Sequence, residues 1–563
     1  MGRGLANATS LPGLLLGLAL EDPARSMLGY WRDGAWRRMP RGDFAQAVAD
    51  AAAGLRAQGV MPGDRVVLVA ESRPEFMIAD NAVMAIGAVT VPTYVTNTVA
   101  DHAHILRDSG ARAAIVSTPA LAARLRQAGE LDLLVCMDDP PAGALPWLEL
   151  TGTRADAAAL IAEVEQIPEG RLACLVYTSG TGGTPRGVML PHRALLANCR
   201  AVNALLSKLL RVPREATYLS FLPMSHSYEH TVGGFIMPSA GVEVVFSRGA
   251  ERLAQEFGQH RPHVITAVPR LFEVLRERIT TQVEKAGGLS AKLFGRALAL
   301  GMRRMDGPPL GLLEKLEDAA LDRLVRNKVR DRFGGRLEAL VSGGARLDPA
   351  LSGFFLALGI PVIQGYGQTE AGPVISVNLP WDNDRRSVGR PLQGVETRLG
   401  EDGELLVRGA LVMDGYWNNP AATEAALREG WLHTGDVAEM RDGRLYITDR
   451  KRDFIKLKGG DMVAPAKIEA LLAGEPEIAQ AVAAGEGLAG VVALVVAADG
   501  RTAEVEQAIR RVNAKLSPVE RVRRHAVLPE PFTVENGLMT PTMKVKRRQV
   551  LERHGRLVQS LAS

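Results

Sequence analysis

Short apolar runs alternate with stretches of helical periodicity along most of the chain. The run 65–70, for example, precedes the helical stretch 74–86. Apolar runs of this kind are typical of buried strands, and their alternation with helices predicts an α/β fold with mostly parallel sheets. Ligands of such sheets bind at the carboxyl ends of the strands. Further strands are predicted at 113–116, 242–246, 264–268, 337–341 and 361–363.

Two regions depart from this alternation. From about Phe272 to Arg332, Arg, Lys, Glu and Leu recur at helical spacing without a strand pattern. An inserted helical hairpin is predicted here, and its charges fit a solvated face better than a nucleic-acid surface. The apolar stretch 11–20 is too short to span a bilayer and shows no evident cationic n-region with a small-residue cleavage site, so a buried N-terminal helix is expected.

Composition narrows the class of protein. A chain of 563 residues predicts two or more domains, and a net charge of +4 is too small to indicate nucleic-acid binding. Cys136, Cys174 and Cys199 show no metal-binding spacing and fit a reducing, cytoplasmic location. Peripheral contact with the inner face of a membrane and homodimerisation both stay open.

The segment 177–187 carries the strongest chemical signal. It places glycines and hydroxyls between an apolar run and a helical pattern that begins near Pro191, with the cation Arg186 near its end. Glycines let backbone N–H groups approach phosphate oxygens and a helix N-terminus favours anions, so a phosphate-binding loop is predicted. The motif GxxxxGK[ST] of ordinary P-loops is absent. A surface loop without a ligand is the alternative for this segment alone.

Two more glycine-bearing turns, 342–345 and 364–370, follow predicted strands. Together they are expected to form a flat slot in which Tyr366 offers an aromatic face to a base. Thr369 supplies a donor for a phosphoryl oxygen, and Glu370 a hard oxygen ligand for Mg²⁺. A helix-starting or surface carboxylate is the alternative for Glu370 taken alone.

The last third of the chain holds three further patterns. A tight turn at 431–436 would let the Asp436 carboxylate accept both hydroxyls of a ribose, with Arg450 nearby. Lys544 follows a Pro–Thr turn that would hold it on a defined loop. The segment 485–490 fits GxGxxG, but a strand pattern follows it where a dinucleotide site needs a helix, so a turn between two strands is predicted.

These segments, together with 222–230 and 456–465, resemble in their order the AMP-forming acyl-CoA synthetases, and the resemblance covers nearly the whole chain. It implies a large N-terminal adenylate-forming domain of sheets flanked by helices at 1–450. A small, mobile α+β domain is implied at 451–563.

Three features resemble the long-chain fatty acid branch of that superfamily: the helical insertion at about 273–335, the segment 462–469 and the ending 535–542. The resemblance implies ATP-dependent activation of a long-chain fatty acid to acyl-AMP, then thioester formation with coenzyme A. An apolar tunnel would suit the acyl tail, because each buried methylene contributes roughly 0.8 kcal/mol. The first step needs no general base, since a carboxylate is already a nucleophile, and should depend on positioning and charge neutralisation.

The resemblance also implies a role for each site residue. Lys544 would bridge the carboxylate and the α-phosphate, Thr369 would bind the α-phosphate, and His226 would line and gate the acyl pocket. Mg²⁺ would be held by Thr181 and Glu370. The residues implied in ATP binding are Thr178, Ser179, Gly180, Thr181, Gly182, Thr184 and Arg186 at pyrophosphate, Gly344, Ala345 and Tyr366 at adenine, and Asp436 and Arg450 at ribose. Gln364 and Gly365 are implied in binding the same cofactor.

For the second step, the resemblance implies that the small domain rotates about a hinge at Arg452. Rotation would withdraw Lys544 and bring in Lys458, Gly459 and Gly460 to shape the thiol tunnel for coenzyme A.

Two positions depart from the family pattern. Arg186 stands where most relatives carry lysine, and Gly182 replaces a threonine; arginine keeps the charge and presents a planar fork to phosphate. Two alternative functions remain. One is a fatty acyl-AMP ligase that loads a carrier protein, and the other is a non-catalytic nucleotide- or acyl-binding relative.

Overall fold

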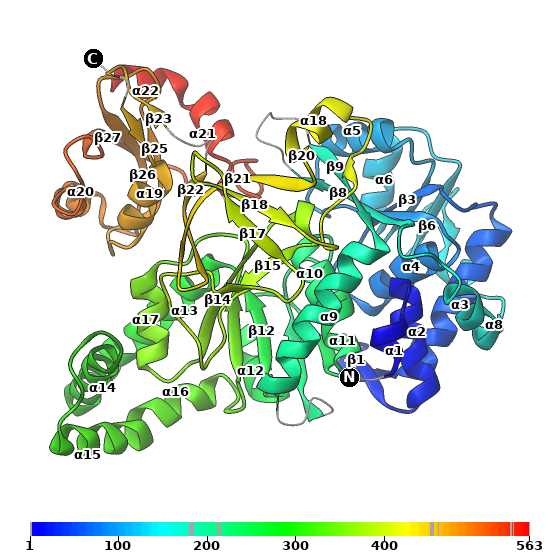
Figure 1. Ribbon diagram of the computed structural model, residues 1–563, viewed down its shortest axis with the longest axis horizontal. Helices are drawn as coiled ribbons and strands as arrows, with labels where there is room; N and C mark the ends of the chain where they lie inside the picture. Colours follow the sequence, from blue (N-terminus) through cyan, green and yellow to red (C-terminus); the bar gives the residue numbers. More distant parts are fainter. Residues whose placement is uncertain are drawn as a thin grey trace.

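A computed structural model describes residues 3–178, 185–210, 215–450, 455–459, 461–540, 543 and 545–561. Figure 1 shows the N-terminal half on the right, protruding helices at the lower left and the C-terminal part at the upper left. Between them lies a sheet drawn in yellow and yellow-green. The predicted combination of α/β and α+β architecture is confirmed by this arrangement.

The first sheet is mostly parallel and has helices on both faces. Val66 and Leu68 of β3 pack in the core that includes α3 and α4, whereas Val67 and Val69 pack against α5 and α6. Strands buried on both faces read as continuous apolar runs, which explains the sequence pattern. The strand order is β19 (Gly415–Tyr416), β9 (Arg186–Pro191), β8 (Leu172–Thr178), β4 (Val89–Pro92), β3 (Arg65–Val69), β5 (Ala113–Val116), β6 (Leu133–Cys136) and β7 (Leu145–Pro146). The helices are α3 (Arg41–Ala57), α4 (Pro74–Ala85), α5 (Val99–Ser109) and α6 (Pro119–Ala128).

The second sheet is also mixed, with a parallel centre. One face packs against the same apolar core that includes α3 and α4, to which helix α9 (His192–Leu209) also contributes. The other face packs against α12 (Leu253–His260), α13 (Pro269–Ala286) and α17 (Pro349–Ala357). The strand order is β16 (Arg390–Pro391), β15 (Val374–Val377), β14 (Val362–Gly367), β13 (Ala339–Ser342), β12 (Val264–Ala267), β10 (Thr217–Ser220), β11 (Glu243–Phe246), β1 (Ser26–Arg32) and β2 (Ala35–Pro40).

A third, antiparallel sheet lies next to these two in Figure 1. Its long central strand, β21 (Trp431–Arg441), pairs with β18 (Glu404–Arg408), β20 (Leu427–Arg428) and β22 (Arg444–Arg450), and β18 pairs with β17 (Glu396–Leu399). Helix α18 (Pro420–Ala426) precedes β20. This sheet brings the Asp436 segment towards the carboxyl ends of the second sheet.

The C-terminal residues form a smaller α+β unit with its own apolar clusters. Strands β25 (Ile478–Ala484) and β26 (Val491–Ala497) pair antiparallel, and β27 (Val522–Leu528) adds parallel to β26. The GxGxxG segment joins β25 to β26, so the predicted turn between two strands is confirmed. The other elements are β23 (Ile455–Lys456), β24 (Met462–Val463), α19 (Pro465–Ala473), α20 (Val505–Asn513), α21 (Arg547–Arg553) and α22 (Gly555–Ser560). A domain boundary at 450/451 stays a prediction.

The N-terminal apolar stretch forms α2 (Leu11–Glu21), which begins after the N-cap Ser10 and buries most of its leucines. The expected buried helix is therefore confirmed. Among the residues that the structure describes, no helix has both the length and the apolar character needed to cross a bilayer.

Candidate active site

A cavity of about 480 Å³ lies between one face of the second sheet and α9, and reaches the carboxyl ends of β13 and β14. Its position agrees with the rule that parallel sheets bind ligands at their carboxyl ends. Several predicted residues from separate segments of the chain meet here. Those that line the cavity are Thr178, Arg186, His226, Gly344, Gly365, Tyr366, Thr369 and Glu370.

The predicted phosphate loop connects two strands. β8 ends at Thr178 and β9 begins at Arg186, and the two residues are antiparallel partners. The helix expected near Pro191 is confirmed, because α9 begins at His192, but the loop is shorter than predicted, because Arg186 and Gly187 pair with Thr178 and Tyr177. The loop residues Ser179, Gly180, Thr181, Gly182 and Thr184 lie outside the described residues.

Tyr416 contacts two of the predicted site residues. The Arg186 guanidinium lies over its ring, 5.5 Å from the ring centroid, and its hydroxyl donates a hydrogen bond to Glu370 Oε1 at 2.8 Å. Pairing between β19 and β9 places Tyr416 beside the base of the phosphate loop. A planar guanidinium stacks on an aromatic ring, so arginine at position 186 suits this contact. Sequence reasoning missed Tyr416, whose only local signal is a Gly–Tyr pair followed by a turn.

His226 caps the short helix α10 (Ser227–Thr231). Its Nδ1 accepts a hydrogen bond from the Tyr228 backbone N–H at 3.2 Å, so a neutral ring carries its proton on Nε2. The next residue, Ser227, shares a hydrogen bond with Thr369, with 2.9 Å between Oγ and Oγ1. The cap therefore places His226 and Thr369 at the same part of the cavity, while the gating role of His226 stays a prediction.

Asp436 lies in a bulged strand, and the prediction of a tight turn is wrong. The register between β18 and β21 shifts beside it, where Gly435 adopts a φ of +73°. The Glu404 carboxylate holds the bulge by accepting a hydrogen bond from Gly435 N–H at 2.8 Å and contacting His433 Nδ1 at 3.0 Å. Sequence reasoning missed Glu404, because only pairing between β18 and β21 brings it to this bulge.

The bulge directs Asp436 towards Tyr366, whose hydroxyl donates to Asp436 Oδ2 at 2.6 Å. The two residues predicted at ribose and adenine are therefore in direct contact. Asp436 itself does not line the cavity. Arg450 stands opposite Asp436 in the β21–β22 register, and its side chain lies outside the described part of the chain.

The second predicted glycine turn is part of strand β14, so this prediction is also wrong. β14 continues to Gly367 because β15 pairs with it, with a register shift at Tyr366 and Gly367. A Cβ atom at Gly367 would lie 1.9 Å from the Pro373 carbonyl oxygen, so only glycine fits this pairing. The Gln364 side chain is directed elsewhere: it accepts a hydrogen bond from Leu347 N–H at 3.0 Å.

The glycine turn after β13 approaches the cavity closely. Gly344 lines it with a φ of +75°. Gly343, which sequence reasoning did not select, also lines it, and a Cβ atom there would lie 2.8 Å from the Tyr228 ring. Neither Ala345 nor Gln364 lines the cavity.

Two of the residues predicted to act from the small domain, Lys458 and Gly459, are described by the structure. Lys458 and Gly459 lie in the turn between β23 and β24, and Lys458 N–H donates to the Leu488 carbonyl. Neither lines the cavity. Gly460, the hinge residue Arg452 and the catalytic candidate Lys544 lie outside the described residues. The roles of all five stay predictions.

A buried carboxylate supports α10 from behind the cavity. Burial raises the pKa of Glu229 to about 7, although hydrogen bonds from Ser220, Tyr218 and Thr266 act in the opposite direction. Ser220 Oγ donates to Oε1 at 2.6 Å, and Thr266 Oγ1 donates to Oε2 at 2.9 Å. Because Thr266 also lines the cavity, Glu229 connects α10 to the cavity wall on the second sheet.

This pKa predicts a pH-dependent stability. Between about pH 4.5 and 7, the native state binds a proton at Glu229 that the unfolded chain has lost, so the free energy of unfolding should fall as pH rises through this range and then level off. Glu229→Gln removes the ionisable group. The free energy of unfolding of the wild type, measured relative to that of the variant, should therefore fall by up to ~3 kcal/mol between about pH 4.5 and 7. Urea unfolding of both proteins at several pH values measures this difference, and parallel stability curves would contradict the prediction.

Comparison with known proteins identifies the family. Residues 19–417 match the family described as AMP-binding enzyme, and residues 452–562 match the AMP-binding enzyme C-terminal domain. The chain belongs to the AMP-binding enzyme family, and is an adenylate-forming acyl-CoA synthetase by its similarity to curated members.

One such relative is the long-chain-fatty-acid–CoA ligase FadD15 of Mycobacterium tuberculosis, 33% identical over 95% of this chain and 94% of that protein. Another is the peroxisomal long chain acyl-CoA synthetase 6 of Arabidopsis thaliana, 30% identical over 92% of this chain and 80% of that protein. Among solved structures, the o-succinylbenzoate coenzyme A synthetase MenE of Bacillus subtilis, in complex with ATP and magnesium ion, has the same fold. Its TM-score is 0.71 at 21% identity, covering 95% of this chain and 98% of that one.

Proposed function

We propose that the protein joins a long-chain fatty acid to coenzyme A in two steps, consuming ATP and releasing AMP and pyrophosphate. One observation carries this proposal: a single cavity has the polar groups of Thr369 and Glu370 in one part and the apolar side chains of Val264 and Ala339 in another. The similarity to long-chain-fatty-acid–CoA ligases over nearly the whole chain supports the same reaction.

In the first step, a carboxylate oxygen of the acid attacks the α-phosphorus of ATP. The bond from phosphorus to the bridging oxygen breaks, and pyrophosphate leaves with that electron pair. The chain must reduce repulsion between the anions and align them. Thr369 offers a hydroxyl donor to the α-phosphate, and Arg186 offers a cation to the pyrophosphate.

The residues present suit Mg²⁺. Glu370 places a carboxylate in the cavity, and carboxylate oxygens are the ligands that Mg²⁺ prefers. Thr181 is the second ligand in this proposal. When bound, Mg²⁺ would neutralise charge on the phosphates.

The apolar part of the cavity follows the strands away from the nucleotide residues. Val264 and Ala339 are paired at the amino ends of β12 and β13, whereas Gly343 lies just beyond the carboxyl end of β13. Four residue steps along the strand lead from Ala339 to Gly343, roughly 13 Å at ~3.3 Å per residue. The facing wall is an apolar stripe on α9 with helical spacing: Val202, Leu205, Leu206 and Leu209. This wall supports a long acyl tail as the ligand.

A larger side chain at the end of the cavity remote from the nucleotide residues should make the enzyme prefer a shorter fatty acid. Ala339→Leu adds three carbons where the side chain is fully buried against the cavity. Displacing about three methylenes of a long tail should lower kcat/KM for palmitate by ~50-fold, at roughly 0.8 kcal/mol each. Octanoate, which would not reach this end, should be affected by less than about threefold. Equal losses for both acids, with an unchanged melting temperature, would contradict the assignment of the acyl end.

In the second step, the thiolate sulfur of coenzyme A attacks the acyl carbonyl carbon and AMP leaves. We place Lys458, Gly459 and Gly460 at the thiol tunnel after rotation of the small domain about Arg452. A carrier-protein thiol is the competing acceptor. An assay that offers both thiols to preformed acyl-AMP distinguishes them: preferential transfer to the carrier protein would overturn the coenzyme A proposal.

The whole reaction is tested with a panel of straight-chain acids from acetate to icosanoate, each with ATP, Mg²⁺ and coenzyme A. AMP release should rise steeply for the longer acids. Absence of fatty-acid-dependent exchange of pyrophosphate into ATP, in folded protein, would exclude the activity and leave a nucleotide- or acyl-binding protein.

We also propose a cytoplasmic location with peripheral contact at the inner face of a membrane. Three unpaired, buried cysteines suit a reducing compartment, and long-chain acids partition into lipid. Homodimerisation stays a prediction, which sedimentation of the pure protein would test.

A further inference from the structure

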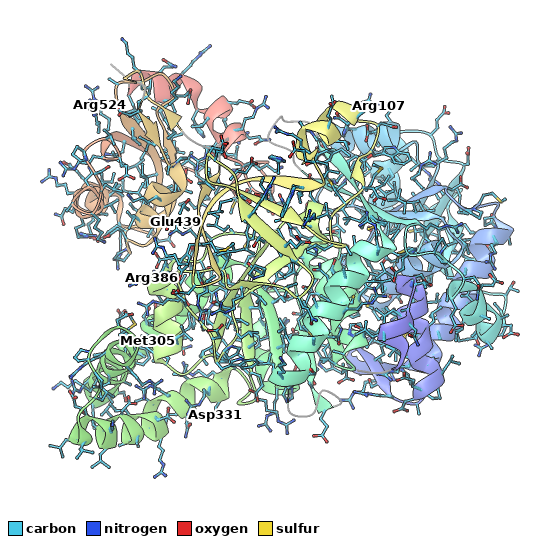
Figure 2. All side chains as sticks on the ribbon, in the orientation of Figure 1. Arg107, Met305, Asp331, Arg386, Glu439 and Arg524 are labelled. Atoms are coloured by element: carbon cyan, nitrogen blue, oxygen red, sulfur yellow. The ribbon has the colours of Figure 1, made fainter. Side chains whose placement is uncertain are left out.

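The insertion after α13 forms a protruding arm, defined here as residues 288–332. It consists of α14 (Gly288–Asp306), α15 (Leu312–Leu321), the π-helical turn η3 (Asp322–Arg326) and α16 (Asn327–Arg332). In Figure 1, α14 and α15 form the lower-left extremity of the molecule. Figure 2 shows side chains that project outward from the arm, on which Met305 and Asp331 are labelled. The arm therefore offers a surface well away from the main body.

A buried arginine makes the arm rigid. Arg326 is almost fully buried and donates hydrogen bonds to the carbonyl oxygens of Ala297 and Ala357, each at 2.8 Å. It also pairs with Asp318 Oδ1 at 2.6 Å. These bonds connect α14, α15 and α17, and Leu300 and Leu321 pack in a small core between them. The arm thus holds its outer face in a fixed orientation.

That outer face is apolar. Leu312, Leu313 and Leu316 of α15 are 83%, 82% and 70% exposed. They occupy one side of the helix by spacing, while Leu321 on the other side is buried against α14. Leu289 and Leu324 are also exposed on the arm. Isolated exposed leucines need no explanation, but a row of them on one helix marks an interaction surface.

The charge of the arm specifies the kind of surface that it fits. It contains ten Lys and Arg residues against six Asp and Glu, a net charge of +4 that equals the net charge of the whole chain. The remainder of the chain therefore has equal numbers of cationic and anionic residues. The carboxylates of α15, on Glu314, Glu317 and Asp318, pair with Arg303, Arg296 and Arg326. Exposed cations lie beside the leucines and further along the arm: Lys315, Arg323 and Lys328. Exposed leucines on an arm with an excess of cations are typical of helical segments that lie on anionic lipid.

The base of the arm adjoins the cavity. Asp306, the last residue of α14, forms an ion pair with Arg385 in the loop between β15 and β16. The same loop supplies Leu379 and Pro380 to the cavity wall. It also exposes Trp381, a residue type enriched at membrane–water interfaces. Docking of the arm would therefore bring this wall of the cavity near the lipid surface.

We propose that the arm is a docking element for an anionic lipid bilayer, with Leu312, Leu313 and Leu316 inserted at the headgroup level. The proposed lipid binding follows from the residues of the arm alone. The benefit of this binding to the enzyme rests on the proposed function, because a membrane is where a long-chain acid is concentrated.

Co-sedimentation of the full chain with vesicles tests the proposal. Equimolar phosphatidylglycerol–phosphatidylcholine vesicles should bind the protein at least about tenfold more strongly than phosphatidylcholine vesicles, and salt should weaken this binding. The triple substitution of Leu312, Leu313 and Leu316 to Gln should lower the partition coefficient by about 30-fold, or ~2 kcal/mol. The matched control is Leu148→Gln, which changes a leucine that is 81% exposed in the separate helix α7 (Trp147–Leu150). This control should leave binding unchanged.

A second variant tests the cations of the arm without changing its leucines. Lys315→Glu with Arg323→Glu should lower binding to anionic vesicles by at least about tenfold while the melting temperature stays the same. Binding that is unaffected by both variants would overturn the proposal. So would a triple variant that retains vesicle binding but changes from dimer to monomer on sedimentation, because a second copy would then be the occupant. Octanoate activation in vesicle-free solution should be unchanged in every variant, which separates failure of docking from failure of the proposed reaction.

Discussion

Lys544→Ala should reduce acyl-AMP formation by roughly 10²- to 10³-fold while ATP binding changes little. The ammonium group would approach both the carboxylate and the α-phosphate most closely as they react, so its contribution is made mainly in the transition state. Loss of one well-placed donor to such a site typically costs ~3–4 kcal/mol. Fatty-acid-dependent exchange of pyrophosphate into ATP measures the first step, and calorimetric titration measures ATP binding.

Lys546→Ala provides the matched control for Lys544→Ala. This second lysine lies two residues later, at the N-cap of α21, where its backbone N–H donates to the Leu538 carbonyl, so side-chain truncation preserves that bond. Its exchange rate should stay within about twofold of the wild type. Chemically supplied acyl-AMP should still be converted to acyl-CoA by Lys544→Ala. Equal exchange rates in the two variants would show that Lys544 does not act in the first step.

Glu370→Gln should produce the second large effect, a loss of about 10²-fold in acyl-AMP formation together with a higher Mg²⁺ requirement. Glutamine keeps the size of the side chain and an oxygen that can accept the Tyr416 hydrogen bond, but it loses the negative charge that attracts the cation. Initial rates measured over a range of Mg²⁺ concentrations at saturating ATP and fatty acid test this prediction.

Tyr416→Phe separates the charge of Glu370 from its positioning. Phenylalanine keeps an aromatic ring beneath Arg186 and removes only the hydroxyl that reaches Glu370. Loss of one hydrogen bond to a charged group should cost roughly 1.5–3 kcal/mol at most, so a decrease of about tenfold is expected, with little change in Mg²⁺ dependence. If Tyr416→Phe and Glu370→Gln shift the Mg²⁺ dependence equally, Glu370 acts through Tyr416 and is not itself a metal ligand.

The fold class was predictable because its signals are local. Apolar runs such as 65–70 and 264–268 became buried strands, since a strand covered on both faces must be apolar throughout. The GxGxxG segment was correctly assigned to a strand connection, because the following residues, 491–496, have strand and not helical character. The family also followed from short motifs, whose order along the chain is part of the sequence.

The errors share one physical cause. Residues 186–191 are a strand because they pair with β8, and Gln364 to Gly367 belong to β14 because β15 pairs with them. In each case a glycine-rich segment looked like a turn when considered alone. Antiparallel pairing with another segment supplied the hydrogen bonds that its own residues do not specify.

Local pattern along the chain was therefore sufficient for the α/β class, the buried N-terminal helix and most of the chemically active side chains. Tertiary contacts settled which of those side chains share one cavity. They added Tyr416 between Arg186 and Glu370, placed Glu404 at the bulge of Asp436, and turned Gln364 towards Leu347. Such contacts join residues far apart in the chain, and their geometry depends on strand register and bulges. Register is fixed by packing across the whole sheet, which no local stretch of residues encodes.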